Sequence, residues 1–403
     1  KILFVSLPAW GHMDLGVCIR VASFLQQGHQ VAWATGYPLK QYVHKLGFDF
    51  FPVAPHKDVS CLAEQSRPMD GRERQAFAID NFFLNEESLR AGIQELLEAC
   101  REFRPDLICS EPFHFCTATV AEILDLPWTT YGRNILPSRE DAVARSIWVA
   151  GMARLNQVRA EFQLKPLAFG SASLSPLLCL SFSCPSFELE SLQSPGRSTL
   201  VGVPLLDVVP KRSTGKTHPY AVVSLGSVFQ DATLLESITS AVLRMGWQVV
   251  LAQGVHSSLP PALTKRDGVL VLPYIDHAEW FPHAEAVICH GGYSTTKDAL
   301  SVGVPLVVIP LGSDNPLNAE RVRKTDTGIC LSRRETSQNA IHVALLALRD
   351  DPKFRINASR LQAEFARYGG ARQAADLLLQ VVQERQSPQA VANQNHERGT
   401  GLV

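Results

Sequence analysis

Residues 286–310 have the sequence AVICHGGYSTTKDALSVGVPLVVIP. A short apolar run at Ala286–Cys289 leads through two glycines into a segment with helical patterning, and a second apolar run follows at Pro305–Ile309. Short β-branched runs that alternate with helical segments are typical of a parallel sheet with crossover helices. The stretch therefore predicts one strand–helix–strand unit of an α/β protein.

The same alternation extends over both halves of the chain and predicts two α/β domains. At 403 residues the chain exceeds the roughly 250–300 residues at which a single core stops growing. A segment rich in Pro, Gly and charge near Gly202–Pro219 is typical of an exposed linker. We expect an N-terminal domain over residues 1–203, a linker over 204–219, a C-terminal domain over 220–384, and a polar, disordered tail over 385–403. Further strands are expected at Ile2–Leu7, Gln30–Thr35, Asp106–Ser110, Trp128–Tyr131, Leu177–Phe182, Ala221–Leu225, Gln248–Ala252, Gly268–Leu272 and Gly328–Leu331.

Composition narrows the class of protein. Lys plus Arg number 38 and Asp plus Glu number 39, so the chain has none of the basic excess of a nucleic-acid binder. Nine cysteines are scattered without CxxC pairs, and we expect reduced thiols in the cores rather than disulfides. The first apolar run is too short for a membrane span and shows no signal-peptide pattern. We therefore expect a cytoplasmic protein without stable membrane insertion; the sequence says nothing of its oligomeric state.

The turn inside residues 286–310 carries groups suited to a diphosphate. Its glycines, Gly292 among them, let the backbone come close to a ligand and direct N–H groups at it. Ser294 and Thr295 add hydroxyl donors, and His290 adds an imidazole. The spacing matches neither G-x-G-x-x-G nor G-x-x-x-x-G-K-[ST], so it indicates neither a Rossmann dehydrogenase nor a P-loop NTPase. An ordinary strand–turn–helix with Ser/Thr capping would use the same residues.

A second loop, Leu311–Ala319, follows the apolar run at Pro305–Ile309. In a parallel sheet it lies at the same edge as the glycine turn, because the carboxyl ends of neighbouring strands meet there. Asp314 and Asn315 are able to accept hydrogen bonds from sugar hydroxyls, and Asn315 also to donate them. Taken singly, Asp-Asn-Pro is only a turn signal. Its place beside the glycine turn makes it a candidate ligand loop.

The stretch from Tyr274 to Arg321 resembles the donor signature of the family 1 glycosyltransferases, the UDP-glycosyltransferase-like enzymes of the GT-B fold, in their bacterial natural-product branch. The match runs almost continuously through YIDHAEWFPHAEAVICHGG and STTKDALSVGVPLVVIPLGSDNPLNAERV. The sequence motifs themselves match closely only in the second half of the chain. In the first half the resemblance lies mainly in the order of strands and helices. The resemblance implies an α/β GT-B architecture, with two doubly wound Rossmann-like domains facing across a cleft.

The resemblance also implies a set of donor residues. Tyr274 stands where the family stacks an aromatic ring on the nucleobase, and the backbone of Ile275 would contact the base edge. Asp276-His277 stands where Pro-Gln is usual, and Asn315 is one carbon shorter than the usual Gln. The implied phosphate contacts are His290, Gly292, Ser294, Thr295 and, in the turn that opens the second domain, Ser227; the implied sugar contacts are Asp314 and Asn315.

A candidate base follows the first strand, in the sequence Ala9-Trp10-Gly11-His12. Displacement at an anomeric carbon needs a base beside the attacking hydroxyl, and histidine takes a proton readily near neutral pH. Gly11 leaves room for a substrate to approach. His12 matches the family's Gly-His motif, whose histidine is the proposed base, although Asp14-Leu15 replaces the Asn-Pro that often follows. A histidine that only caps its helix is the alternative.

A base histidine works better with a carboxylate that orients it and stabilises the imidazolium ion. In the family this acid lies at the end of a later strand after a Pro-Asp pair. Pro105–Glu111 matches that pattern, with Glu111 where Asp is more usual. Asp14 is the rival partner for His12, and the absence of any carboxylate partner is the third alternative.

The resemblance and the lone base together imply single displacement with inversion. The helix start at His290–Thr296 would stabilise the leaving diphosphate, the role that a metal has elsewhere. No Asp-x-Asp follows a strand, so we expect no metal and no cofactor beyond a UDP- or dTDP-sugar as co-substrate. Trp10, Phe82-Phe83 and Phe113-His114-Phe115 weakly indicate a small hydrophobic acceptor, since such aromatic clusters are also typical of cores.

Two other classes of protein are compatible with this fold. A GT-B sugar-nucleotide epimerase binds the same donor, but it needs carboxylates for elimination and no Gly-His base. A non-catalytic partner subunit of an active transferase would have lost the base, so the presence of His12 argues against it. The sequence favours a glycosyltransferase over both.

Overall fold

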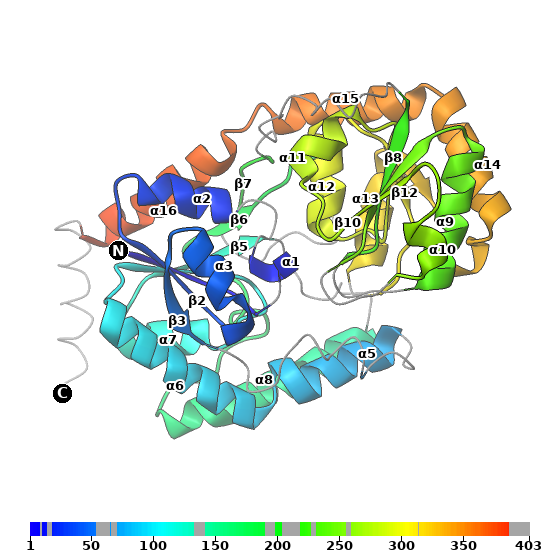
Figure 1. Ribbon diagram of the computed structural model, residues 1–403. Helices are drawn as coiled ribbons and strands as arrows, with labels where there is room; N and C mark the ends of the chain where they lie inside the picture. Colours follow the sequence, from blue (N-terminus) through cyan, green and yellow to red (C-terminus); the bar gives the residue numbers. More distant parts are fainter. Residues whose placement is uncertain are drawn as a thin grey trace, which may run out of the picture. The chain divides into compact units, whose positions relative to one another are not determined.

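A computed structural model describes residues 1–8, 10–13, 18–53, 65, 71–132, 142–189, 198–203, 218–226, 231–254, 259–312 and 314–386. The chain forms two compact units (Figure 1). Unit 1 comprises Lys1–Phe182, Glu190–Val201 and the chain from Ala371 on, and unit 2 comprises Ser183–Leu189 and Gly202–Gly370.

Unit 1 is built on a parallel sheet with the strand order β3-β2-β1-β4-β5-β6-β7 in its described part. The strand order reverses between β1 and β4, which makes their shared carboxyl end the switch point where ligands of such sheets bind. The strands are β1 (Ile2–Val5), β2 (Val31–Thr35), β3 (Asp49–Pro52), β4 (Leu107–Ser110), β5 (Trp128–Gly132), β6 (Cys179–Ser181) and β7 (Ser198–Leu200).

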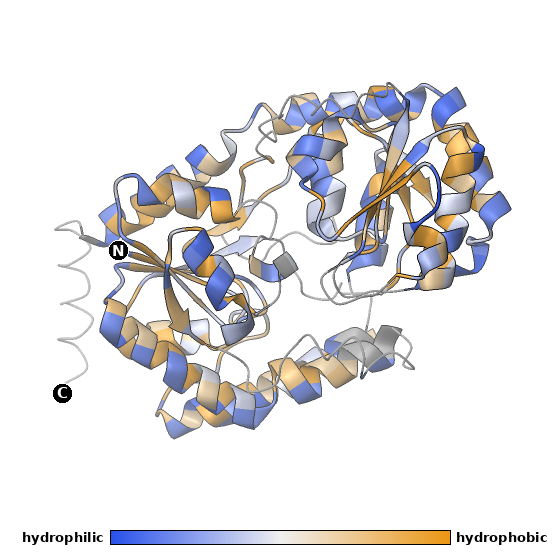
Figure 2. Cartoon of the chain, in the orientation of Figure 1, coloured by the Kyte–Doolittle hydropathy of each residue, from blue (hydrophilic) through white to orange (hydrophobic). Residues whose placement is uncertain are grey.

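Helices cover both faces of this sheet, and each face has its own apolar core. Helices α6, α7 and α8 pack on one face, and α2, α3 and α16 pack on the other. Hydrophobic residues line the strands and the inner faces of the helices (Figure 2). The helical elements are α1 (Trp10–Met13), α2 (Cys18–Gln26), η1 (Tyr37–Leu39), α3 (Lys40–Lys45), α5 (Gly71–Ala78), the π-helical turn η3 (Ile79–Phe83), α6 (Glu86–Phe103), α7 (Thr117–Leu124), α8 (Ala142–Glu161) and α16 (Gly370–Gln386).

Unit 2 repeats the plan with a parallel sheet whose described strands have the order β10-β9-β8-β11-β12-β13. Its switch point lies between β8 and β11. The strands are β8 (Tyr220–Ser224), β9 (Gln248–Ala252), β10 (Val269–Leu272), β11 (Ala286–Cys289), β12 (Leu306–Val308) and β13 (Gly328–Cys330).

The helices of unit 2 also divide between the two faces of its sheet. Helices α12, α13 and α15 share a core on one face, and α9 and α14 share the other. The elements are α9 (Ala232–Arg244), α10 (Pro261–Thr264), α11 (His277–Trp280), η5 (Phe281–His283), α12 (Tyr293–Ser301), α13 (Asn315–Lys324), η6 (Arg333–Glu335), α14 (Gln338–Asp350) and α15 (Lys353–Phe365).

The α/β class with two doubly wound units is confirmed, and every strand expected from the sequence forms near its expected bounds. Two strands were not expected, β3 and β7. Both are edge strands of unit 1, with four and three residues. Strands this short carry too few alternating residues to be distinguished from loops.

Two segments join a different unit from the one expected. Helix α16 begins within the expected C-terminal domain, yet Ala374, Leu378 and Val381 pack in the core of unit 1 beside α2 (Figure 1). In the opposite sense, Ser183–Leu189 comes from the expected N-terminal domain and belongs to unit 2. The reason is again burial of apolar side chains, since Phe187 enters the core of unit 2.

The expectation of reduced thiols is confirmed for the eight cysteines that the structure describes, which are all thiols outside disulfides and, apart from Cys330, buried. Across the described residues, no helix has the length and apolar character needed to cross a membrane. Of the expected linker, only residues 218 and 219 are described, and of the expected tail, only 385 and 386, which end α16.

Candidate functional site

The switch point of unit 1 brings two predicted residues together. Strands β1 and β4 pair in parallel with Val5 opposite Ser110, so their carboxyl ends lie side by side. Glu111 directly follows β4, and His12 lies on α1, shortly after β1. Two segments about a hundred residues apart in the chain therefore end at one edge of the sheet.

Glu111 and His12 are in direct contact. Nδ1 of His12 lies 2.7 Å from Oε2 of Glu111, and the other carboxylate oxygen accepts a hydrogen bond from the backbone N–H of Leu7 at 2.5 Å. The Glu111 side chain has no exposed surface, whereas that of His12 is 29% exposed. A buried carboxylate thus holds a histidine that is open to solvent. The rival partner, Asp14, lies outside the described residues.

The aromatic residues expected near this point separate into two groups. Phe82 and Phe115 are buried core residues, and so is His114, whose pKa burial lowers from 6.5 to about 4. Phe113 and Phe83 are only partly buried. The ring of Phe113 lies 5.2 Å from the His12 imidazole and 5.5 Å from the Phe83 ring, measured between centroids.

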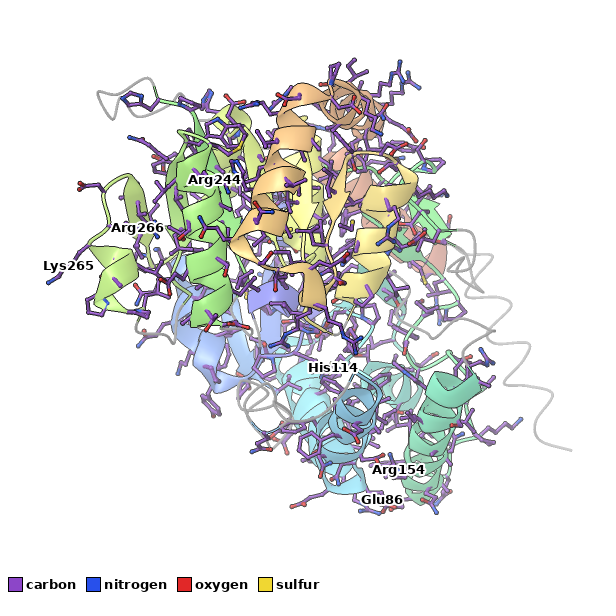
Figure 3. All side chains as sticks on the ribbon, turned by 90° about the vertical axis from the view of Figure 1, so that its right-hand side faces the viewer. Glu86, His114, Arg154, Arg244, Lys265 and Arg266 are labelled. Atoms are coloured by element: carbon purple, nitrogen blue, oxygen red, sulfur yellow. The ribbon has the colours of Figure 1, made fainter. Side chains whose placement is uncertain are left out.

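The π-helical turn η3 presents Phe83, and Arg154 holds that turn in place. Arg154 extends from α8 (Figure 3) and donates hydrogen bonds to the backbone oxygen of Leu84 at 2.8 Å and to Asp80 at 2.5 Å. Single π-helical turns of this kind are frequent at functional sites. Here Phe82 points into the core while its neighbour Phe83 joins Phe113.

Gly11 stands beside His12 on α1 and is exposed. A methyl group built at this position would meet no protein atom within 4 Å. Among the residues that the structure describes, packing therefore does not require glycine at this position. The side chain of Trp10 lies outside the described residues.

The switch point of unit 2 holds the glycine turn. Strands β8 and β11 pair with Ser224 opposite Cys289, so the turn after β8 lies beside the turn that starts at His290. The imidazole of His290 fits between two glycines. A Cβ on Gly226 would lie 2.7 Å from its Cε1, and a Cβ on Gly292 would lie 2.6 Å from its Nε2. Any side chain at either position would displace the ring.

His290 is buried, and burial lowers its pKa below the ordinary value of 6.5. The Asp314 carboxylate and the Ser224 backbone act in the opposite direction without overcoming burial. His290 is therefore a neutral imidazole at pH 7, with one nitrogen that donates and one that accepts.

Helix α12 begins directly after this imidazole. Gly292 is its N-cap and has no side chain to accept a hydrogen bond, so the first N–H groups of the helix have no side-chain acceptor at that position. Thr295 is buried and Ser294 is partly exposed in the first turn. Ser227, expected at the same place, lies outside the described residues. The start of α12 combines a helix dipole, backbone donors and a hydroxyl, as an anion site requires.

The loop between β10 and α11 carries the expected nucleobase contacts. The Tyr274 side chain is 70% exposed. Ile275 is buried in the core of unit 2, which leaves a base contact to its backbone. His277 was not assigned a role from the sequence, yet its Nδ1 lies 2.7 Å from Oδ2 of Asp298 on α12, and its ring stacks on Phe281. The pair ties this loop to the helix that starts at the glycine turn.

The two expected sugar contacts differ in accessibility. Asp314 is partly exposed. Asn315 is 2% exposed, and its Oδ1 accepts hydrogen bonds from the backbone N–H groups of Leu311 at 3.3 Å and Gly312 at 3.1 Å. In this conformation the amide oxygen of Asn315 shapes its own loop.

Asn318 and Arg321 were not among the residues expected at the site, although both are fully buried and polar. Asn318 contacts Gly291 of the glycine turn and Asp314 of the second loop. The available signal was the spacing Asp314–Asn318–Arg321, which places three polar side chains on one side of a helix. Among the residues that the structure describes, no group of three His, Cys, Asp or Glu side chains has the arrangement of a metal site.

Comparisons with known proteins agree with this architecture. Residues 244–376 match the family model described as erythromycin biosynthesis protein CIII-like, C-terminal domain. The chain is 30% identical to oleandomycin glycosyltransferase of Streptomyces antibioticus, over 96% of this chain and 93% of that protein.

Two solved structures share the fold at 20% identity. The glycotransferase of kitacinnamycin aligns with a TM-score of 0.75 over 94% of this chain and 98% of that one. A spinosyn rhamnosyltransferase, solved in complex with thymidine diphosphate, aligns with a TM-score of 0.72 over 94% of this chain and 99% of that one. The paired switch points, the glycine turn of unit 2 and the full-length match to a curated glycosyltransferase lead to one conclusion: the chain is a glycosyltransferase and belongs to family 1, the UDP-glycosyltransferase-like enzymes of the GT-B fold.

Proposed function

We propose that this enzyme transfers a sugar from a UDP- or dTDP-sugar to a hydroxyl of a small, hydrophobic acceptor, with inversion and without a metal ion. The observation that carries the proposal is the 2.7 Å contact between Nδ1 of His12 and the buried carboxylate of Glu111. A carboxylate only accepts hydrogen bonds, so Nδ1 carries the proton and Nε2 is the basic nitrogen.

The reaction then needs one displacement. The acceptor hydroxyl gives its proton to Nε2 of His12 while its oxygen bonds to the anomeric carbon, and the bond from that carbon to the diphosphate oxygen breaks. The nucleoside diphosphate leaves with the bonding electrons. Glu111 stabilises the imidazolium ion that forms. Attack on the side opposite the leaving group inverts the anomeric configuration.

The donor half of the proposal rests on unit 2. The leaving diphosphate is assigned to the start of α12, where backbone N–H groups, the Ser294 hydroxyl and the neutral imidazole of His290 offer hydrogen bonds. Such fixed donors stabilise negative charge as it develops, without a bound cation. The exposed ring of Tyr274 is assigned to the nucleobase and Asp314 to the sugar. The thymidine diphosphate bound to the related rhamnosyltransferase supports a nucleoside diphosphate in this role.

The acceptor half rests on the rings beside the base. Phe113 and Phe83 form a partly exposed aromatic pair next to His12, and aromatic surface favours apolar or planar ligands. We therefore assign the acceptor to this pair. Phe113→Ala should raise the acceptor KM about tenfold and leave nucleotide affinity unchanged, because a well-packed aromatic contact is worth about 1 kcal/mol or more.

The first test is thermal stabilisation by UDP, dTDP, GDP and ADP, with NAD as a control. A ligand that binds the folded state raises the melting temperature. We expect a shift with UDP or dTDP that shrinks in His290→Ala. No shift with any diphosphate, or a shift with NAD alone, would contradict the donor assignment.

The second test is product analysis. Purified enzyme with the selected donor and a panel of apolar alcohols and phenols should give a glycoside of inverted configuration, measured by NMR of the anomeric proton. The rate should be unchanged after treatment with EDTA. Conversion of the donor alone would indicate an epimerase, and activity only after addition of a second protein would indicate a partner subunit.

A further inference from the structure

Asn318 lies at the first turn of α13 and is fully buried. One amide nitrogen, Nδ2, donates hydrogen bonds to two loops. It lies 2.7 Å from the backbone oxygen of Gly291 in the glycine turn and 2.8 Å from Oδ2 of Asp314. Helices α12 and α13 follow these two loops and lie beside each other (Figure 1). A single side chain thus joins the loop assigned to the diphosphate to the acid assigned to the sugar.

The partners of Asn318 determine which way its amide points. A guanidinium group only donates hydrogen bonds, and carbonyl and carboxylate oxygens only accept them. Nη1 of Arg321 lies 3.3 Å from Oδ1 of Asn318, so the oxygen of the amide faces Arg321 and its NH₂ group faces Gly291 and Asp314. Arg321 is itself buried, and its Nη2 contacts Oε2 of Glu188 at 3.3 Å. Only a side chain that both accepts and donates satisfies this position.

The contact with Gly291 has a consequence for the phosphate loop. In a trans peptide the C=O and N–H groups point in opposite directions, and the bond between Gly291 and Gly292 is trans. Because Asn318 holds the Gly291 oxygen on one side, the N–H of Gly292 points to the other side. Gly291 has φ +85°, and a Cβ there would lie 2.9 Å from Val308. Glycine takes this left-handed conformation without strain, and the hydrogen bond from Asn318 fixes the direction of the Gly291 oxygen within it.

We propose that Asn318 is a positioning residue of the donor site, which aligns the Gly292 N–H for the diphosphate and the Asp314 carboxylate for the sugar. The inference rests on the proposed donor site of unit 2. Asn318 does not touch the donor substrate itself. Through Gly291 and Asp314 it acts on both the diphosphate and the sugar of the donor. Its removal should therefore weaken binding of the bare diphosphate as well as of the nucleotide sugar.

The test compares Asn318→Asp with Asp314→Asn, using calorimetric titration with dTDP, UDP and the matching nucleotide sugar. Asn318→Asp keeps the shape and the contact with Arg321, but it removes the donor to Gly291 and opposes two carboxylates. We expect about three- to tenfold weaker diphosphate binding, the equivalent of one or two hydrogen bonds, and a larger loss for the nucleotide sugar. Asp314→Asn keeps an acceptor for Asn318, so it should weaken only the nucleotide sugar.

Two further variants separate positioning from folding. The exchange variant carries both substitutions, Asp314→Asn and Asn318→Asp. It restores a hydrogen-bond donor and an acceptor between these two side chains and removes the repulsion of two carboxylates. It does not restore the hydrogen bond to the Gly291 oxygen. It should fold and still bind the diphosphate weakly. Asn156→Asp is the matched control, because Asn156 of α8 also donates from its amide to a backbone oxygen, that of Leu167 at 3.1 Å. It should bind every nucleotide as the wild type does.

Two results would overturn the inference while the donor site stands. In one, folded Asn318→Asp binds the diphosphate as tightly as the wild type; in the other, the exchange variant recovers full diphosphate affinity. Absence of diphosphate binding by the wild type is a different outcome, because it would remove the proposed donor site and this inference with it.

Discussion

The imidazole of His12 contacts the carboxylate of Glu111, 99 positions further along the chain, at 2.7 Å. The Glu111 side chain is fully buried, and its second oxygen accepts the Leu7 N–H. A buried carboxylate is costly unless hydrogen bonds compensate for the lost water. His12 and Leu7 supply them, so these two hydrogen bonds offset the cost of burying Glu111.

The first prediction concerns the tautomer of His12. In Glu111→Gln the amide oxygen can still accept from Leu7, but the NH₂ group then faces Nδ1 of His12 and favours the tautomer with its proton on Nε2. That tautomer cannot accept a proton from the acceptor at Nε2. We expect kcat to fall by about 10²–10⁴-fold with nucleotide affinity unchanged, measured by initial rates and calorimetry.

A matched variant controls for the loss of one carboxylate in unit 1. Glu122 pairs with Arg159, which is not part of the proposed site, and its side chain is 44% exposed, so Glu122→Gln should retain nearly full activity. If Glu111→Gln also keeps its rate within about threefold, far less than general base catalysis contributes, then Glu111 does not orient the base.

The second prediction separates stability from activity at Gly11. Alanine has a higher helix propensity than glycine, and the added methyl group meets no protein atom, so Gly11→Ala should not lower the melting temperature. If an acceptor approaches the α1 backbone, the methyl group should still raise the acceptor KM. Gly28→Ala is the control, because that position is equally open and lies outside the proposed site. An unchanged KM in Gly11→Ala would show that no ligand approaches there.

In each unit, the sequence predicts the parts of the candidate site that depend on strand ends. His12, Glu111, His290 and Asp314 each follow a parallel strand, and strands β1 with β4 in unit 1 and β11 with β12 in unit 2 are neighbours. Doubly wound sheets place such residues at the same edge whatever the loops between them do. The pattern of strands and turns was therefore sufficient to place these residues at strand ends, whereas the pairing of Glu111 with His12, rather than with Asp14 as the rival, was implied by the family resemblance.

Features that depend on packing were not predicted. The apolar face of α16 is visible in the sequence, but the pattern does not say which core it covers. In the π turn η3, Phe82 is buried in the core and Phe83 contacts Phe113. The sequence alone does not predict which of these two adjacent phenylalanines has which role. The role of Asn318 follows only from the structure, which places Gly291 and Asp314 within hydrogen-bond distance of its amide. These are long-range contacts, and local periodicity carries no information on them.

The third prediction distinguishes two roles for Asn315. Its Oδ1 accepts from the N–H groups of Leu311 and Gly312, and a carboxylate at the start of α13 would accept the same bonds with support from the helix dipole. If Asn315 acts by shaping its loop, Asn315→Asp should keep the donor KM within about threefold, while Asn315→Ala should raise it about tenfold through loss of two hydrogen bonds. If the amide N–H contacts the sugar directly, both variants should be equally impaired. Steady-state kinetics with varied donor separates the two cases.

The fourth prediction concerns the stability of the enzyme in acid. His114 is labelled in Figure 3 and is buried in unit 1, where its Nδ1 lies 2.9 Å from Oγ1 of Thr117. Burial lowers its pKa from 6.5 to about 4. Between these values the unfolded chain binds a proton that the folded chain excludes, so the stability contributed by neutral His114 is complete above pH 6.5 and falls as the pH falls. The loss should reach about 2 kcal/mol between pH 6.5 and about 4.5.

His114→Gln removes this titration and keeps an amide group at the position. The variant should be less stable than the wild type at pH 7.5, but the difference in melting temperature should shrink by several degrees as the pH falls toward about 4.5, at roughly 2–4 °C per kcal/mol for a unit of this size. Scanning calorimetry across this range measures it, and the comparison between the two proteins cancels the carboxylates that both titrate. Parallel melting curves at every pH would mean that His114 is protonated as easily in the folded chain as in the unfolded one, and the burial assigned to it in unit 1 would then be wrong.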